Sequence, residues 1–272
     1  MFDFDKAEAD ARKDLDNKSL QCLVLGPSGS GKSALLGTFG VKTLFLYGST
    51  ENHGPVSAKK FGGDNIRAIC IARDDDGKDL DANETYQRVL AILDSDLVKR
   101  GIKAIAIDGA TELEGIIRNT TQWQQLCTTD KGKHNGFAEP SATIQMLRPI
   151  FARLKKLNLD HDIMYGMSLI LKVREYGDNG EIMDSEPSLS GYSVADWLCQ
   201  QFPDYFAIGP MVKGDKEAHR IQFLAGIAKS AKDQNGRVKK TLNFKPRVTG
   251  VLNPPATMDA NLSKVAELKK GA

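Results

Sequence analysis

The sequence has few of the residues that cross-link a chain or hold a structural metal. Its four cysteines, Cys22, Cys70, Cys127 and Cys199, stand far apart without a CxxC spacing. Its four histidines are equally scattered, and none has the spacing of a metal-ligand set. A disulfide framework and a zinc site are therefore disfavoured, and we expect buried free thiols.

Long apolar runs, internal repeats and low-complexity tracts are absent as well. The longest apolar stretch, residues 163–171, is too short to cross a bilayer. The chain begins Met-Phe-Asp-Phe-Asp, which is acidic where a signal peptide would be basic and then apolar. We therefore expect a cytoplasmic protein that does not enter a membrane.

What is present fits one large α/β domain. The chain has 272 residues, of which 41% are hydrophobic, and this is enough to bury one sizeable core. Short apolar runs alternate with amphipathic stretches, which favours a mostly parallel central sheet with helices on both faces. We expect strands at residues 20–25, 43–47, 66–72, 104–107 and 162–171, and helices at residues 32–39, 84–97 and 142–157.

The segments outside this alternation differ in character. Residues 1–18 are strongly charged and are expected to form an N-terminal arm, and residues 19–250 form the core. Turn-forming residues 213–216 separate two apolar runs, which predicts an antiparallel hairpin at the sheet edge. Residues 251–272 are expected to be a basic tail. Residues 201–272 carry 13 Lys and Arg against 6 Asp and Glu, which favours a polyanionic partner.

The most specific motif follows the first expected strand. It has the pattern GxxxxGK[ST] between an apolar strand and an expected helix, a context that an ordinary Gly/Ser loop lacks. Its glycines let backbone N–H groups point inward as an anion nest. Lys32 is expected to reach the β- and γ-phosphates of ATP, and the Ser33 hydroxyl is expected to bind Mg²⁺. This motif is called a P-loop, and it comprises Gly26, Pro27, Ser28, Gly29, Ser30, Gly31, Lys32 and Ser33.

Carboxylates that would serve this phosphate site occur downstream. Asp108 follows the apolar strand at 104–107, a position that suits the carboxylate on the metal side. Hydrolysis also requires a group that orients and deprotonates water. Glu51, just after the strand at 43–47, and Glu112, in the turn after Asp108, both qualify. The residues alone do not choose between them.

Residues 50–62 resemble a segment of the RecA family. They contain Glu51, His53 and an Ala-Lys-Lys sequence, in the order that follows the P-loop helix in that family. The resemblance implies that Glu51 activates the attacking water. Residues 107–112 are similar to the Ile-Asp-Ser-Leu-Thr pattern of small phage-encoded RecA-core ATPases, the single-strand annealing recombinases.

The resemblance covers residues 20–247 and implies a RecA-like ATPase core that binds single-stranded DNA and promotes annealing or recombination. ATP hydrolysis would then depend on Mg²⁺ and be stimulated by DNA. The chain departs from the family pattern at two positions. Gly109 replaces a serine near the metal, and Lys172 stands where the family has a phosphate-sensing glutamine.

The resemblance also implies partners. Lys229 and Lys232 match paired lysines that contact the nucleotide of a neighbouring subunit in this family, and Lys245 and Arg247 are alternative candidates for that role. A homo-oligomer, either a filament or a ring, is therefore expected. A single-strand-binding protein is a further candidate partner.

Two loops are expected to face DNA in such a fold. The first carries Lys131, Lys133 and, at its end, Phe137. Cations that hold phosphates and an aromatic ring that stacks on bases are what single-strand binding requires. The second loop, residues 173–190, contributes Arg174 but is too acidic for a simple backbone clamp. Both loops are also compatible with ordinary surface segments.

Two other functions fit a P-loop. A small-molecule kinase would need an acceptor site and a mobile basic lid, but the run from Asp74 to Asp76 is acidic where a lid would be basic. A weakly hydrolysing ATP-dependent loader or scaffold is compatible with Gly109 and Lys172. Stimulation of ADP release by DNA, rather than by a small acceptor, would separate the first interpretation from the kinase.

Overall fold

The computed structural model of the chain describes residues 19–50, 53–176, 182–213, 216–232, 238–246 and 261–271. The expected N-terminal arm lies outside these residues, and so do Glu51, Arg247 and the centre of the second loop, residues 177–181.

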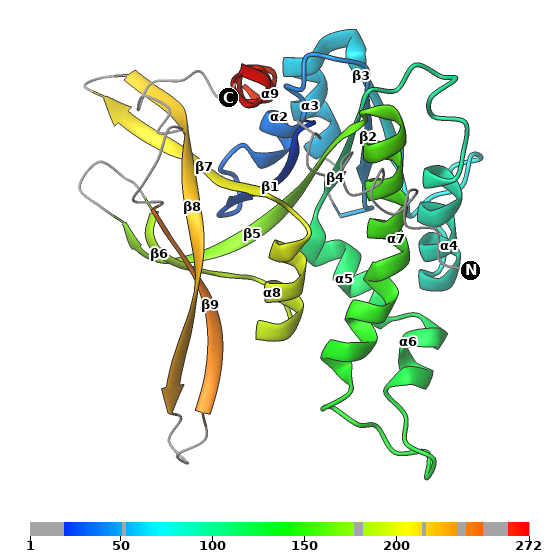
Figure 1. The fold of residues 1–272 in the computed structure, drawn as a ribbon. Coiled ribbons are helices and arrows are strands. Elements are labelled where there is room, and N and C mark those ends of the chain that lie inside the picture. The colour runs from blue at the N-terminus through cyan, green and yellow to red at the C-terminus, as the bar shows by residue number, and fades with distance from the viewer. Residues whose placement is uncertain are drawn as a thin grey trace, which may run out of the picture.

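Within these residues, a nine-stranded sheet forms the centre of the molecule (Figure 1). Neighbouring strands run parallel in the order β3-β2-β4-β5-β1-β7. The sheet then continues antiparallel through β8, β9 and β6 back to β5. The strands are β1 (Gln21–Gly26), β2 (Thr43–Tyr47), β3 (Ile66–Cys70), β4 (Ala104–Asp108), β5 (Met164–Tyr176), β6 (Ile182–Pro187), β7 (Asp204–Lys213), β8 (Lys216–Lys232) and β9 (Val238–Pro246).

Helices cover both faces of the parallel strands, which confirms the expected α/β architecture (Figure 1). Alternate side chains of β1 enter two separate cores, as the two-residue period of a strand requires. Leu23 and Leu25 pack with α4 to α8, whereas Cys22 and Val24 pack with α2, α3 and α9. The helices are α2 (Lys32–Leu36), α3 (Gly54–Gly62), the 3-10 turn η1 (Gly63–Asn65), α4 (Ala82–Leu93), α5 (Ala110–Arg118), α6 (Thr121–Leu126), α7 (Glu139–His161), α8 (Tyr192–Gln200) and α9 (Leu262–Gly271).

The antiparallel part is larger than the sequence predicts. Lys213 and Lys216 are register partners, so β7 and β8 form the hairpin expected around residues 213–216. β8 then runs on to pair with β9, and β5 runs on to pair with β6. β5 and β7 thus belong to both the parallel and the antiparallel parts, which hydrophobic alternation in short windows does not indicate.

Local signals fix several helix ends. At α4, the Asp81 side chain accepts from the Glu84 N–H and the Glu84 side chain accepts from the Asp81 N–H, a capping box that satisfies two orphan donors. At α7 a proline lies in the first turn, and Asp162 ends the helix with a φ of 54°. This helix is therefore longer at both ends than the predicted residues 142–157.

The four cysteines are free, and Cys22, Cys127 and Cys199 are buried, as expected. Burial raises the pKa of the Cys199 thiol to about 12 and also raises that of Cys127, so both thiols remain protonated at neutral pH. In the part of the chain that the structure describes, no helix combines the length and apolar character needed to span a membrane.

Candidate phosphate-binding site

The candidate site lies where parallel strands end at the same edge of the sheet. β1 ends in Gly26 and β4 ends in Asp108, with β5 between the two strands. The helix after β1 packs on one face of the sheet and the helices after β4 pack on the other. Crevices of this kind, between connections that leave toward opposite faces, are where open α/β sheets bind ligands.

Glycine shapes the loop between β1 and α2. Gly29 and Gly31 have φ values of 76° and 94°, in the left-handed region that glycine adopts without strain. A Cβ on Gly26 would collide with Ser30 Oγ and would lie 2.8 Å from the carbonyl oxygen of Ile208. The three glycines therefore permit a tightly wrapped backbone that other residues could not form.

Lys32 folds back over this loop. It is the first residue of α2, and its Nζ donates to the carbonyl oxygen of Pro27 at 2.7 Å. The N-cap residue, Gly31, has no side chain that could cap the helix. The backbone N–H groups at the start of α2 and the Lys32 ammonium thus lie together, as an anion site requires.

Asp108 carries the most distinctive polar atom of the site. The side chain is buried, with the residue 4% exposed. Its Oδ2 has no hydrogen-bond partner among the described residues. A Cβ on Gly54, at the start of α3, would collide with this oxygen and would lie 3.5 Å from Ser33 Oγ. The carboxylate oxygen and the hydroxyl therefore face the same small space.

These two oxygens fit a magnesium ion. Mg²⁺ prefers oxygen ligands and is usually held by one or two carboxylates together with substrate phosphates. No cluster of three or more His, Cys, Asp or Glu side chains that could hold a metal occurs in the described part of the chain. A buried carboxylate oxygen without a protein donor is otherwise costly.

Ser168 orients Asp108, and the sequence does not single it out for this role. Ser168 Oγ donates to Asp108 Oδ1 at 2.7 Å and accepts from the Gly109 N–H at 2.7 Å. The serine lies on β5, opposite Val24 of β1 in the register. Only the strand order brings it beside β4, since 60 residues separate it from Asp108. A polar residue inside an otherwise apolar predicted strand was the available signal.

Glu112 lies at the neighbouring strand end. Its Oε1 accepts from the Thr50 N–H at 3.2 Å, and its carboxylate fills the space that a Cβ on Gly48 would occupy. Its Oε2 is buried and has no hydrogen-bond partner in the described segments. Glu112 thus contacts the loop after β2 that leads to Glu51, which itself lies outside the described residues.

The backbone conformation explains why position 109 is a glycine, where the RecA family has a serine. Gly109 precedes α5 and has a φ of 101°. Glycine adopts this backbone conformation readily, whereas a serine would be strained there. The backbone at the end of β4 therefore explains why position 109 carries no serine.

The remaining cationic candidates, on β5 and β8, lie in the antiparallel part of the sheet. Lys172 is exposed and is the register partner of Glu186 on β6. Arg174 donates to Glu186 Oε2 at 2.5 Å, so its charge is already paired. Lys229 and Lys232 lie on β8 opposite β9. All four lie in the antiparallel part of the sheet, although Lys172 is only two residues beyond Ile170, the register partner of Gly26.

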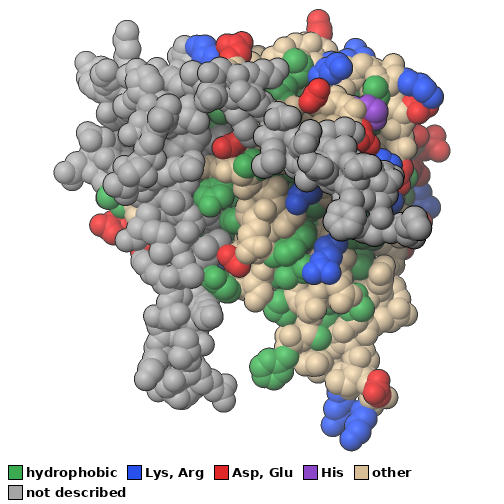
Figure 2. Space-filling view, in the orientation of Figure 1, with side chains coloured by type: hydrophobic (Ala, Val, Ile, Leu, Met, Phe, Trp, Pro, Cys, Tyr) green, Lys and Arg blue, Asp and Glu red, His purple; other side chains and the backbone are tan. Residues whose placement is uncertain are grey.

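The loop before α7 forms a compact turn that carries the first group of DNA candidates. Thr128 and His134 pair as an antiparallel bridge. Lys131 and Lys133 are exposed near the tip, and Phe137 is 99% exposed. Figure 2 shows cationic side chains at this end of the molecule, where the α6–α7 loop projects in Figure 1. We call residues 128–137 the basic loop.

An ion pair and a hydrogen bond anchor the base of the basic loop. Glu139, at the start of α7, accepts from Arg118 at 2.7 Å and contacts His134 Nε2 at 2.8 Å. The Arg118 guanidinium also lies over the Trp123 ring, 5.2 Å from its centroid. The tip is therefore exposed, but its base is held to α5 and α6. Because α7 runs back to the start of β5, this loop lies toward the edge of the sheet where the parallel strands end, although α7 and α2 pack on opposite faces.

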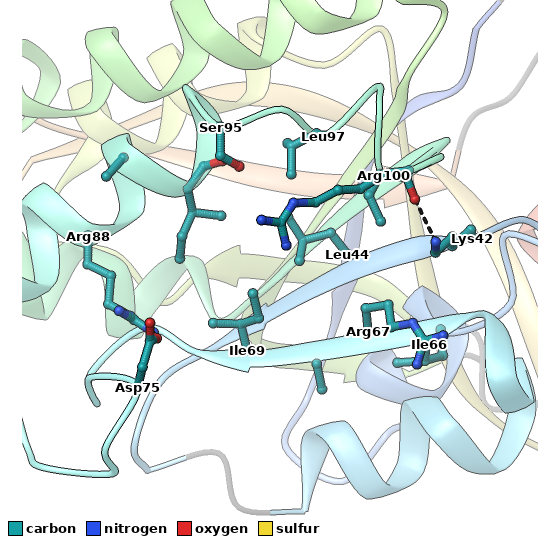
Figure 3. Close-up of a pocket in the computed structure, with 14 residues that line it drawn as sticks. Lys42, Leu44, Ile66, Arg67, Ile69, Asp75, Arg88, Ser95, Leu97 and Arg100 are labelled. Atoms are coloured by element: carbon teal, nitrogen blue, oxygen red, sulfur yellow. Dashed lines mark hydrogen bonds and ion pairs between the residues drawn. The ribbon is translucent and has the colours of Figure 1, made fainter.

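A groove of about 810 Å³ lies elsewhere, at the edge strand β3 (Figure 3). Arg67, Arg88 and Arg100 line it together with apolar side chains. Arg88 pairs with Asp75 at 2.6 Å, and Lys42 Nζ donates to the Arg100 carbonyl oxygen at 2.5 Å. Its lining includes no residue of the P-loop and neither Asp108 nor Glu112. The groove is therefore separate from the candidate site.

Comparisons with known proteins add no family assignment: no family model matches the chain, and neither does any curated protein. The resemblance to RecA proteins consequently rests on the residues of the chain alone.

Proposed function

We propose that this chain is an Mg²⁺-dependent ATPase with a RecA-like core that acts on single-stranded DNA. One observation carries the nucleotide part. The P-loop of Gly26–Ser33 lies at the same sheet edge as Asp108, whose buried Oδ2 has no partner among the described residues and faces Ser33. A phosphate-binding loop beside an unsatisfied acidic oxygen supports the binding of a magnesium nucleotide.

Each residue of the site has a distinct task in this proposal. Backbone N–H groups of the loop hold the phosphates, and Lys32 exchanges its bond to Pro27 for one to the β- and γ-phosphate oxygens. Ser33 and Asp108 would hold Mg²⁺, which supplies a positive charge for the phosphate oxygens. Ser168 keeps the Asp108 carboxylate turned toward that position.

Two glutamates remain candidates for activating water. Glu51 has this role by resemblance to the RecA family. Glu112 has an Oε1 engaged by the Thr50 N–H and a second oxygen without a partner in the described part of the chain. Because the Thr50 N–H donates to Glu112, this carboxylate is suited to hold the loop after β2 in place. This favours Glu51 as the base that activates water and Glu112 as the residue that positions its loop.

The basic loop supports the DNA part of the proposal. Lys131 and Lys133 can contact phosphates, and the exposed Phe137 ring can stack on an unpaired base. The loop precedes α7, which leads into β5, the strand between β1 and β4. The pairing of Arg174 with Glu186 makes the second loop the weaker DNA candidate.

The rate of ATP hydrolysis, measured with and without single-stranded DNA, tests the proposal. We expect Mg²⁺-dependent turnover that rises when single-stranded DNA is added, and no rise with duplex DNA of the same length. Absence of ATP binding would refute the nucleotide assignment. ATP binding with hydrolysis that DNA does not change would refute the DNA assignment.

A weakly hydrolysing ATP-dependent loader is the second candidate function. Lys172 stands at the position of the family's phosphate sensor but is exposed and is the register partner of Glu186 on β6. Such a lysine is poorly suited to report the state of the γ-phosphate. ATP binding and DNA binding with turnover near the uncatalysed rate would favour this alternative.

A further inference from the structure

The C-terminal helix α9 is fastened to the end of the P-loop helix. The Leu262 N–H donates to Thr38 Oγ1 at 2.8 Å, and the Ser263 N–H donates to the Thr38 carbonyl oxygen at 3.0 Å. Thr38 Oγ1 in turn donates to the Leu35 carbonyl oxygen at 2.7 Å. One threonine thus joins the last turn of α2 to the first turn of α9.

Apolar packing reinforces this junction. Leu262 is fully buried, and Val265 and Ala266 are buried with it. They belong to the same core cluster as Leu35 and Leu36, the buried residues of α2. Figure 1 shows α9 beside α2 and α3, although more than 200 residues separate α2 from α9 in the sequence.

The P-loop helix needs such support. α2 has five residues, from Lys32 to Leu36, and glycines at both caps. Isolated helices of this length are not stable in water, so packing decides where α2 lies. Lys32 and Ser33 are its first two residues. Any interaction that fixes the end of α2 therefore also fixes the two side chains expected at the phosphates and the metal.

We propose that Thr38 and α9 are positioning elements of the nucleotide site, so that docking of the C-terminal helix and binding of the nucleotide are thermodynamically linked. The inference rests on the proposed ATP binding. Linkage is reciprocal: if docked α9 raises nucleotide affinity, bound nucleotide must stabilise docked α9 by the same factor. A helix whose local opening leaves the nucleotide site unchanged would not show this second effect in its local exchange.

Substitutions in the full-length chain test the link. Thr38→Val removes the hydroxyl that accepts from Leu262, Thr38→Ser retains it, and Leu262→Ala removes the buried side chain. Glu267→Gln, at an exposed position of α9, is the matched control. We expect Thr38→Val and Leu262→Ala to weaken ATP binding about fivefold or more, the lower end of typical coupling between sites. Thr38→Ser and Glu267→Gln should bind ATP as the wild type does.

Hydrogen exchange supplies the independent readout. ATP should slow exchange of the α9 amides in the wild type, and this protection should shrink in Thr38→Val. Unchanged ATP affinity in folded Thr38→Val and Leu262→Ala proteins, or α9 exchange that ATP leaves unaltered, would overturn the inference. If the wild type binds no ATP at all, the proposed function fails instead, so the two failures are distinguishable.

Discussion

The phosphate site and the basic loop present their polar groups in opposite ways. At the phosphate site, Asp108 is buried with one oxygen unsatisfied among the described residues, and Lys32 bonds to the loop it serves. On the basic loop, Lys131 and Lys133 are exposed to water. Buried groups interact strongly because water does not screen them, whereas exposed charges act weakly and additively. Substitutions in the first region should therefore have the larger effects.

Lys32→Ala should produce the largest change, because the phosphates lose the cation of the P-loop. We expect nucleotide binding to be abolished, since charge-assisted hydrogen bonds to phosphate are the strongest that such a site makes. Fluorescence titration with a labelled ATP analogue measures this directly. Lys42→Ala, outside the loop, is the control. Near wild-type affinity in a folded Lys32→Ala protein would contradict the P-loop assignment.

Glu51→Gln should act on turnover rather than on binding. Loss of a general base typically costs ~10²-fold or more in rate, while ATP affinity should persist because the amide keeps the shape of the side chain. Steady-state hydrolysis and ATP titration separate the two effects. Glu112→Gln is the matched comparison. If it stops turnover and Glu51→Gln does not, the base has been misassigned and the RecA resemblance weakens.

Much of the candidate phosphate site can be predicted from local sequence. The remaining parts can be recognised only when the order of the strands in the sheet is known. The P-loop and Asp108 could be predicted because each lies between a strand and the helix that directly follows it in the sequence. Ser168 is not, because its bond to Asp108 exists only once β5 lies beside β4. The role of α9 was equally inaccessible, since its apolar face is short and its partner Thr38 is distant in sequence.

Ser168→Ala tests a buried side chain that acts on the candidate site only through Asp108. It removes the donor to Asp108 and the acceptor for the Gly109 N–H. Residues that orient a metal ligand typically contribute 10- to 100-fold, so we expect the Mg²⁺ concentration for half-maximal hydrolysis to rise by about tenfold. Ser185→Ala removes another buried hydroxyl, one without a partner in the described residues, and should leave the Mg²⁺ dependence unchanged. Equal Mg²⁺ curves for both variants would remove Ser168 from the site.

The basic loop should give the smallest and most graded effects. Replacing Lys131 and Lys133 with alanine should lower the slope of log affinity for single-stranded DNA against log salt by ~0.7 for each phosphate that the protein no longer neutralises. Phe137→Ala should weaken binding by about 1–3 kcal/mol per stacked base and leave the slope unchanged, because the ring carries no charge. Replacing the exposed Lys155 and Lys156 of α7 removes the same charge elsewhere and serves as the control.

These three variants also decide whether the contrast between the two regions is real. A slope that falls equally in the Lys131/Lys133 and Lys155/Lys156 variants would mean that DNA responds to overall charge and not to this loop. An unchanged slope in both, in proteins that still hydrolyse ATP, would move DNA binding toward the basic residues 201–272. Because α9 lies within that segment and packs against the P-loop helix, its lysines should be replaced singly, since removing the segment would disturb the nucleotide site as well.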